Sequence, residues 1–282
     1  MESLFQSVIF GIVQGITEFL PISSTAHLRI VPSLLHWADP CTAFSAVIQL
    51  GTAFSVVYYF RNDLQKIYGD LLRNIFGVCF RKGSFLSSYE SKLGFWIVIG
   101  TIPICIFGVL FKEPIETGLV RNLNLISFSL VFVALLLVLA ENYARQDKHL
   151  NSISVLDVIL IGFAQSFALI PGVSRSGITI LAGLFLGFKR SDAARFSFLL
   201  SVPAVLASGL FELNTLIKSL NGINHMSYIN LTIGIFAAFV SGYFAIHFLL
   251  KYLQTHKTYI FVVYRIFLGI LIGYLNCRGM IN

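Results

Sequence analysis

Residues 11–29 interrupt an apolar stretch with a carboxylate, an imidazole, a guanidinium and several hydroxyl groups. Gln14 and Glu18 are four residues apart and therefore share one face of a helix. Pro21 then breaks that helix, and three consecutive hydroxyl side chains that can cap a new helix follow it. Because ionisable groups inside an apolar segment are costly, this break predicts a functional site.

Residues 162–179 resemble an edited copy of that segment. The matched pairs are Gly11 with Gly162, Gln14 with Gln165 and, after a slip of one residue, Pro21 with Pro171 and Ser24 with Ser174. The first copy carries acid and base candidates, whereas the second carries an arginine among small residues and hydroxyl groups. The two copies predict an internal repeat in which one copy performs chemistry and the other holds an anion.

The apolar character extends over the whole chain. Of its 282 residues, 56% are hydrophobic and 12% are charged, which is about half the charged fraction of an average protein. A soluble protein of this composition could not cover its surface, so we expect an all-α polytopic membrane protein. Residues 61–92, the longest polar loop, are too few for a separate core, so residues 1–282 are expected to form a single integral membrane domain.

Segment lengths and basic loops predict the topology. Residues 3–35 and 153–188 are each broken into pieces too short to cross a bilayer, so we expect two re-entrant helical hairpins. Residues 61–92 form a basic loop, and basic loops stay on the cytoplasmic side of a membrane, so we expect this loop there. The expected transmembrane helices are residues 41–60, 93–111, 124–140, 196–213, 230–250 and 259–276. This order predicts an inverted-topology repeat. Each half consists of one re-entrant hairpin plus three transmembrane helices. The first half spans about residues 1–140 and the second about residues 153–282.

The second break has the features of an anion site. Backbone N–H groups at the helix start after Pro171 favour an anion, and Arg175 adds a planar guanidinium suited to phosphate oxygens. An arginine that satisfies buried carbonyl groups is the structural alternative. The expected substrate-binding residues are Thr25, Gln49, Ser174, Ser176, Gly177 and Thr179.

The first break supplies the candidates for catalysis, Glu18, Ser24 and His27, with Arg175 from the second. Three routes stay open: attack by Ser24 assisted by His27, attack by His27 itself, and water activated by His27. The sequence favours the first of them, with His27 itself as the next nucleophile. Glu18 is either a general base or, with Gln14, a ligand of a divalent cation, because hard metals prefer oxygen ligands. A purely structural pair of Glu18 with Arg175 is the alternative without chemistry.

These motifs resemble those of a known family. Gln14-x-x-x-Glu18, Pro21-x-Ser-Ser24-Thr-x-His27 and Pro171-Gly-x-Ser174-Arg175-Ser-Gly177 are similar to the motifs of the bacterial undecaprenyl-diphosphate phosphatases, also called bacitracin-resistance proteins. The likeness covers nearly the whole chain. It implies a multi-pass protein of the bacterial plasma (inner) membrane that hydrolyses undecaprenyl diphosphate and recycles the lipid carrier for peptidoglycan synthesis.

The resemblance also implies dependence on a divalent cation, such as Mg²⁺ or Ca²⁺, and an active site that opens to the outer face. The first acidic position of the family accepts Glu or Gln, so Gln14 fits but leaves one carboxylate fewer for a metal.

A transporter or flippase of a phosphorylated lipid or anion is the alternative function, because broken helices and inverted repeats are common in transporters. A carrier needs no nucleophile, so His27 beside Ser24 favours an enzyme. The expected partners are a polyprenyl diphosphate and membrane lipids. A homodimer is possible, and the sequence does not decide the oligomeric state. Nucleic acid is not expected, since the net charge of +7 is not carried by a basic soluble module.

Overall fold

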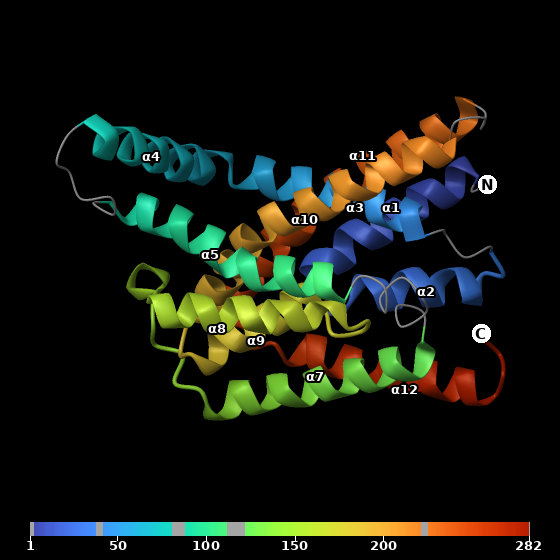
Figure 1. Cartoon of the computed structure of the whole chain (residues 1–282). Coiled ribbons are helices and arrows are strands. Elements are labelled where there is room, and N and C mark those ends of the chain that lie inside the picture. The colour runs from blue at the N-terminus through green and yellow to red at the C-terminus, as the bar shows by residue number, and fades with distance from the viewer. Residues whose placement is uncertain (1–2, 38–41, 81–87, 112–121, 221–224, 282) are drawn as a thin grey trace.

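The computed structural model describes residues 3–37, 42–80, 88–111, 122–220 and 225–281. The helices are α1 (Leu4–Phe19), α2 (Ser24–Leu34), α3 (Thr42–Tyr59), α4 (Arg61–Phe80), α5 (Tyr89–Leu110), α7 (Leu123–Tyr143), α8 (Val155–Ser166), α9 (Arg175–Phe185), α10 (Arg190–Leu220), α11 (His225–Thr255) and α12 (Tyr259–Cys277), with short 3-10 turns η2 (Leu150–Ser152) and η3 (Phe167–Leu169). Figure 1 shows most of them running side by side, with α7 and α12 along one side of the molecule.

Five helices are long and apolar enough to cross a membrane. They are α5, α7, α12, residues Arg190–Leu210 of α10 and residues Tyr228–Thr255 of α11. These confirm five of the six expected spans. The sixth, residues 41–60, coincides with α3, whose described apolar segment is the shorter Val47–Tyr59. The all-helical membrane architecture is therefore as the composition predicts.

Residues 61–92 are not a loop throughout, and that expectation is wrong. A single residue, Phe60, separates α3 from α4, and the amide of Leu64 donates to the carbonyl of Phe60 at 2.8 Å, so the helical hydrogen bonding continues across the junction. Leu64 and Ile67 are buried, whereas Lys66 and Arg73 are exposed. In α4, the charged residues Asp63, Lys66, Asp70 and Arg73 share one face of an amphipathic helix, and the neighbouring apolar face with Leu64 and Ile67 packs inward.

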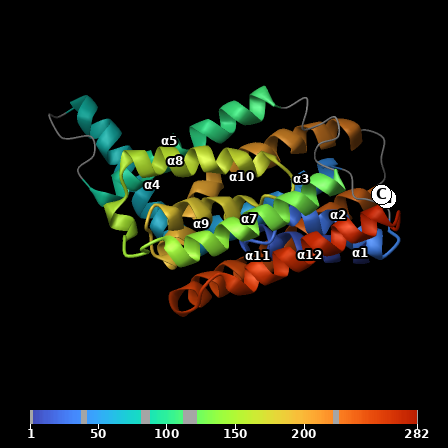
Figure 2. The same ribbon diagram turned by 90° about the horizontal axis from the view of Figure 1, so that it is seen from below.

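Helices that are not neighbours in the sequence pack against each other. α1 lies mainly against α11 and α8 mainly against α5, while α7 pairs with α12 (Figures 1 and 2). Glycines permit the close crossings of α1 with α11 and of α8 with α5. A Cβ on Gly11 would lie 2.3 Å from the carbonyl oxygen of Gly234, and one on Gly162 would lie 2.5 Å from that of Gly100. Small residues at crossings let membrane helices approach closely, so these glycines bring both polar breaks into the bundle.

The Gly162 crossing predicts a loss of stability in Gly162→Ala. Its methyl group has no room against the Gly100 carbonyl, so we expect a cost of about 1–3 kcal/mol and a lower midpoint of thermal unfolding in detergent. Gly108→Ala in α5 is the matched control, because a Cβ there meets nothing within 4 Å. Equal midpoints for the two variants would contradict this packing.

Candidate active site

Both breaks start their second helix with the same unusual cap. Ser23 precedes α2 at φ 75° and ψ 102°, and Ser174 precedes α9 at φ 70° and ψ 118°. Each hydroxyl accepts a hydrogen bond from an amide three residues later, that of Ala26 or Gly177. Positive φ costs a serine of order 1–3 kcal/mol, so surrounding contacts must hold both caps in place. The equivalent of Ser174 is thus Ser23, one residue away from the match with Ser24 that the sequence suggests.

The two breaks touch each other through three hydrogen bonds. Nη2 of Arg175 donates to Oε1 of Glu18 at 2.7 Å. The hydroxyl of Ser176 donates to the carbonyl of Leu20 at 3.2 Å. The amide of Gly172 donates to Oγ1 of Thr25 at 3.4 Å. Acid candidates and anion-binding candidates, which lie more than a hundred residues apart in sequence, therefore form a single site.

Glu18 is the centre of this site. Its Oε2 accepts hydrogen bonds from the hydroxyl of Ser24 at 2.8 Å and from Nε2 of Gln14 at 2.9 Å, in addition to the Arg175 contact on Oε1. Its side chain is only 8% exposed. Both carboxylate oxygens of Glu18 are therefore occupied by donors, and one of these donors is charged.

Both ring nitrogens of His27 have hydrogen-bond partners other than Ser24. Its Nδ1 lies 2.7 Å from the carbonyl oxygen of Ser23, and its Nε2 lies 2.6 Å from the hydroxyl of Tyr264. A carbonyl can only accept, so Nδ1 carries a proton and Nε2 of the neutral ring is the acceptor. The hydroxyl of Ser24 is thus directed at Glu18, and the imidazole is directed at Tyr264.

Arg265 holds the backbone of both breaks, and the sequence analysis missed it. The side chain is fully buried in α12. Its guanidinium donates to the carbonyl of Pro21 in the first break and to those of Gly172 and Val173 in the second. It also donates to the carbonyls of Ser129 and Leu130 in α7. A lone charge inside the apolar span 259–276 was the available signal.

The remaining predicted residues have structural partners or lie apart from the others. Thr179 donates to the carbonyl of Arg175 at 2.8 Å and shares a hydrogen bond with Ser197 of α10. Gly177 gives its amide to the Ser174 cap, and a Cβ on Gly177 would lie 3.3 Å from Arg265. Gln49 lies half-buried on α3, where its carbonyl accepts from Thr52. A substrate-binding role for Gln49 stays a prediction.

Gln14 offers the site a vacant oxygen ligand. Its side chain is fully buried, and Oε1 has no hydrogen-bond partner although Nε2 donates to Glu18. Within the described ranges, no group of three or more His, Cys, Asp or Glu side chains could hold a metal ion. A hard cation at this position would therefore depend on Glu18 and Gln14, with its other ligands drawn from substrate or water.

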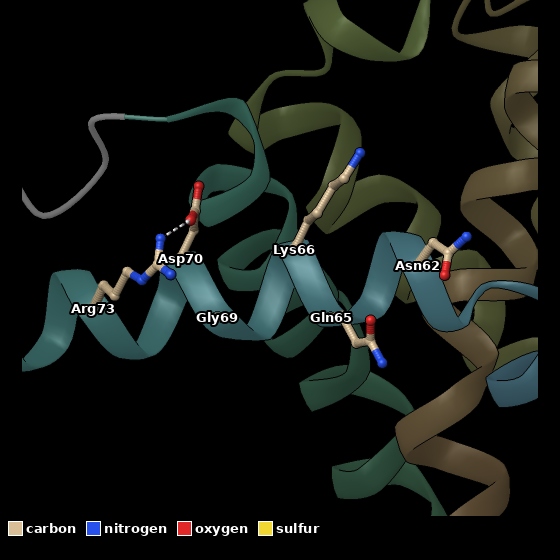
Figure 3. A pocket seen from close by; sticks show the side chains of 6 residues that line it. All are labelled: Asn62, Gln65, Lys66, Gly69, Asp70 and Arg73. Atoms are coloured by element: carbon tan, nitrogen blue, oxygen red, sulfur yellow. Dashed lines mark ion pairs between the residues drawn. The ribbon is translucent and has the colours of Figure 1, made fainter.

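A separate pocket lies on the outer surface of α4. It has a volume of about 410 Å³ and is lined by Asn62, Gln65, Lys66, Gly69, Asp70 and Arg73. Figure 3 shows these side chains along one helix, with the exposed pair of Asp70 and Arg73 at 3.8 Å. The pocket shares no residue with either break, so it is not part of the site.

The fold and the site together define a polytopic helical membrane protein with a buried charged site where two helix breaks meet. Residues 7–271 match the family model described as bacitracin resistance protein BacA. The chain is 48% identical over 275 residues to an undecaprenyl-diphosphatase of Chlorobaculum tepidum, covering 95% of both chains. It is 46% identical over 282 residues to one of Gloeobacter violaceus, covering 99% of this chain and 93% of that protein. The chain therefore belongs to the bacitracin resistance protein BacA family.

The contacts of Arg265 predict that Arg265→Met destabilises the protein strongly. Five carbonyl oxygens lose a donor, at about 1–3 kcal/mol for each one left unsatisfied. We expect a large drop in the unfolding midpoint or no folded protein. Arg278→Met, at the exposed end of the same helix, is the control and should unfold like the wild type. A wild-type midpoint for Arg265→Met would rule out the anchoring role.

Proposed function

We propose that this protein hydrolyses undecaprenyl diphosphate to undecaprenyl phosphate and inorganic phosphate. The observation that carries the proposal is the shared carboxylate of Glu18, which binds both the guanidinium of Arg175 and the hydroxyl of Ser24. A group suited to phosphate oxygens and a nucleophile candidate thus lie on either side of one base candidate. The relatives named undecaprenyl-diphosphatase support the same reaction.

The geometry supports a substrate-triggered activation of Ser24. A diphosphate that binds Arg175 competes with Glu18 for the guanidinium, because phosphate oxygens suit its planar fork. Glu18, released from the guanidinium, accepts the proton of the Ser24 hydroxyl that already bonds to its Oε2. The Ser24 oxygen attacks the terminal phosphorus, the bond to the bridging oxygen breaks, and undecaprenyl phosphate leaves.

In the second half of the reaction, water hydrolyses the phosphoserine. Nε2 of His27, which accepts from the Tyr264 hydroxyl in the resting site, is the base candidate once that water displaces the phenol. Glu18 returns its proton to the Ser24 oxygen as inorganic phosphate leaves. This scheme assigns the serine proton to Glu18 and keeps His27 for water. It differs from the sequence-based preference, in which His27 assists Ser24 directly.

A divalent cation fits the site as a cofactor. Glu18 and Oε1 of Gln14 would hold it, since the latter is a buried oxygen without a partner. When bound, Mg²⁺ or Ca²⁺ supplies positive charge to the diphosphate oxygens, which stabilises phosphoryl transfer.

An apolar groove on α12 is a suitable place for the prenyl chain. It has a volume of about 530 Å³ and is lined by Tyr259, Ile260, Val263, Tyr264 and Phe267. Tyr264 joins this groove to the site because its hydroxyl contacts His27. A lipid could therefore keep its tail on the apolar face of α12 while its head group enters the polar breaks.

We also infer that the chain is an inverted-topology repeat with two re-entrant hairpins, α1–α2 and α8–α9. The exchange of partners supports this symmetry, because α1 packs against α11 and α8 packs against α5. The equivalent caps at Ser23 and Ser174 support it as well. In such folds the site forms where the broken helices of the two halves meet.

Contacts among the expected cytoplasmic segments support the orientation. Glu141 at the end of α7 forms an ion pair with Arg190 of α10 and accepts from the amide of Thr258 before α12. Arg195 forms an ion pair with Asp63 at the start of α4. These segments thus gather at one end of the molecule. We propose that this end is cytoplasmic, that the site opens to the outer face of the bacterial inner membrane, and that the reaction recycles the peptidoglycan carrier and confers resistance to bacitracin.

The first functional prediction concerns the nucleophile. Ser24→Ala should lower phosphate release from undecaprenyl diphosphate in detergent by roughly 10³-fold or more, because it removes the attacking oxygen. Glu18→Gln should trap less phospho-enzyme than the wild type, since it cannot accept the proton. Ser33→Ala in the same helix is the control, because the described hydrogen bond of Ser33 is to the Arg29 carbonyl. Full activity of Ser24→Ala would remove the serine route and favour His27 or water.

The second functional prediction concerns the cation. Gln14→Glu should lower the Mg²⁺ concentration needed for half-maximal activity, whereas Gln14→Leu should raise it, because carboxylate is a better ligand than amide. The same order should appear in the rise of the unfolding midpoint on adding Mg²⁺ without substrate. Identical Mg²⁺ responses in all three proteins would exclude Gln14 as a ligand.

A further inference from the structure

Tyr264 lies at the boundary between the site and the outer surface of α12. Its ring is 40% exposed, while His27 beside it is buried. The centroids of the two rings are 5.6 Å apart, and the ring planes are 4° from parallel. The phenol oxygen lies 2.6 Å from Nε2 of His27. Because the phenol oxygen and Nε2 lie in these two nearly parallel planes, the rings are side by side, and Tyr264 contacts His27 through its hydroxyl.

The contacts of His27 leave the imidazole little freedom. Nδ1 donates to the Ser23 carbonyl, so Nε2 accepts from the Tyr264 hydroxyl. Rotation of the ring would break both bonds, and the other tautomer would place a lone pair against the carbonyl oxygen. The two bonds therefore select which nitrogen is available as a base.

The backbone next to Tyr264 is fixed. Arg265 follows it in α12 and is bound to the carbonyls of Pro21 and Gly172 in the two breaks. The hydroxyl of Tyr264 is therefore held at a defined position relative to the Ser23 cap.

We propose that Tyr264 is the positioning residue of His27. Its hydroxyl selects the tautomer with an unprotonated Nε2, and when the attacking water displaces the phenol, that nitrogen is ready to take the proton of the water. The proposal rests on the proposed hydrolysis, in which His27 activates the water that cleaves the phosphoserine. It adds α12 to the two breaks as a part of the reaction machinery.

Tyr264→Phe tests the role of the hydroxyl, because the variant keeps the ring. We expect kcat for phosphate release to fall by about tenfold or more, with KM unchanged within about twofold. Tyr274→Phe in the same helix is the matched control and should keep both constants. Its ring is exposed and contacts Arg278. Unfolding midpoints within about 2 °C of the wild type would show that the loss does not come from unfolding.

A second readout separates positioning from a structural role. In the wild type, nitrogen NMR of labelled histidine, assigned with His27→Gln, should show an unprotonated Nε2 that accepts a hydrogen bond. In Tyr264→Phe that signal should shift or divide between two tautomers. An unchanged His27 signal, an unchanged kcat, or a rise in KM at constant kcat would each overturn the proposal.

Failure of the proposed hydrolysis and failure of the proposed role of Tyr264 give different results. A wild-type protein that releases no phosphate from undecaprenyl diphosphate would refute the proposed function. The nitrogen signal of His27 would then decide alone whether Tyr264 holds the ring, and an identical signal in wild type and Tyr264→Phe would refute it.

Discussion

The guanidinium of Arg265 is the contact on which the rest of the site depends. Broken backbone inside a membrane leaves carbonyl groups that water cannot reach, so protein donors must satisfy them. A single side chain reaches carbonyls of both breaks and of α7. All of its described partners are carbonyl oxygens, so its positive charge is not neutralised by a carboxylate there. It adds positive potential between the breaks, where the proposed function places a diphosphate.

The pair of Glu18 and Arg175 complements this anchor. Without substrate, the carboxylate and the guanidinium stabilise each other in a site that is almost closed to solvent. Each is then also held in the position it needs for a phosphate ligand, so little reorganisation remains when the ligand arrives. The structural interpretation of this pair and the catalytic one are therefore not exclusive. The same contact stabilises the resting site and, in the reaction we propose, is exchanged for a contact with phosphate.

The sequence predicted the helical membrane fold and the meeting of the two motifs, because hydropathy, Pro21 and Pro171 act locally. It did not predict α4, since its charged side chains conceal an apolar face. It paired Ser24 with His27 by spacing, whereas side-chain rotation turns Ser24 toward Glu18. Tyr264 and Arg265 were missed because their partners lie in distant segments. In the sequence of α12, the isolated charge of Arg265 was the one sign that this helix contributes to the site.

The position of α12 has a consequence for biogenesis. Membrane helices enter the bilayer as they are synthesised, generally from the N-terminus onward, and α12 follows every other helix described. Until it arrives, the carbonyls of Pro21 and Gly172 lack the donor that they have in the complete molecule. A nascent chain that ends before Tyr264 would hold both motifs without the side chain that joins their backbones, so the site is complete only when insertion of the protein is complete.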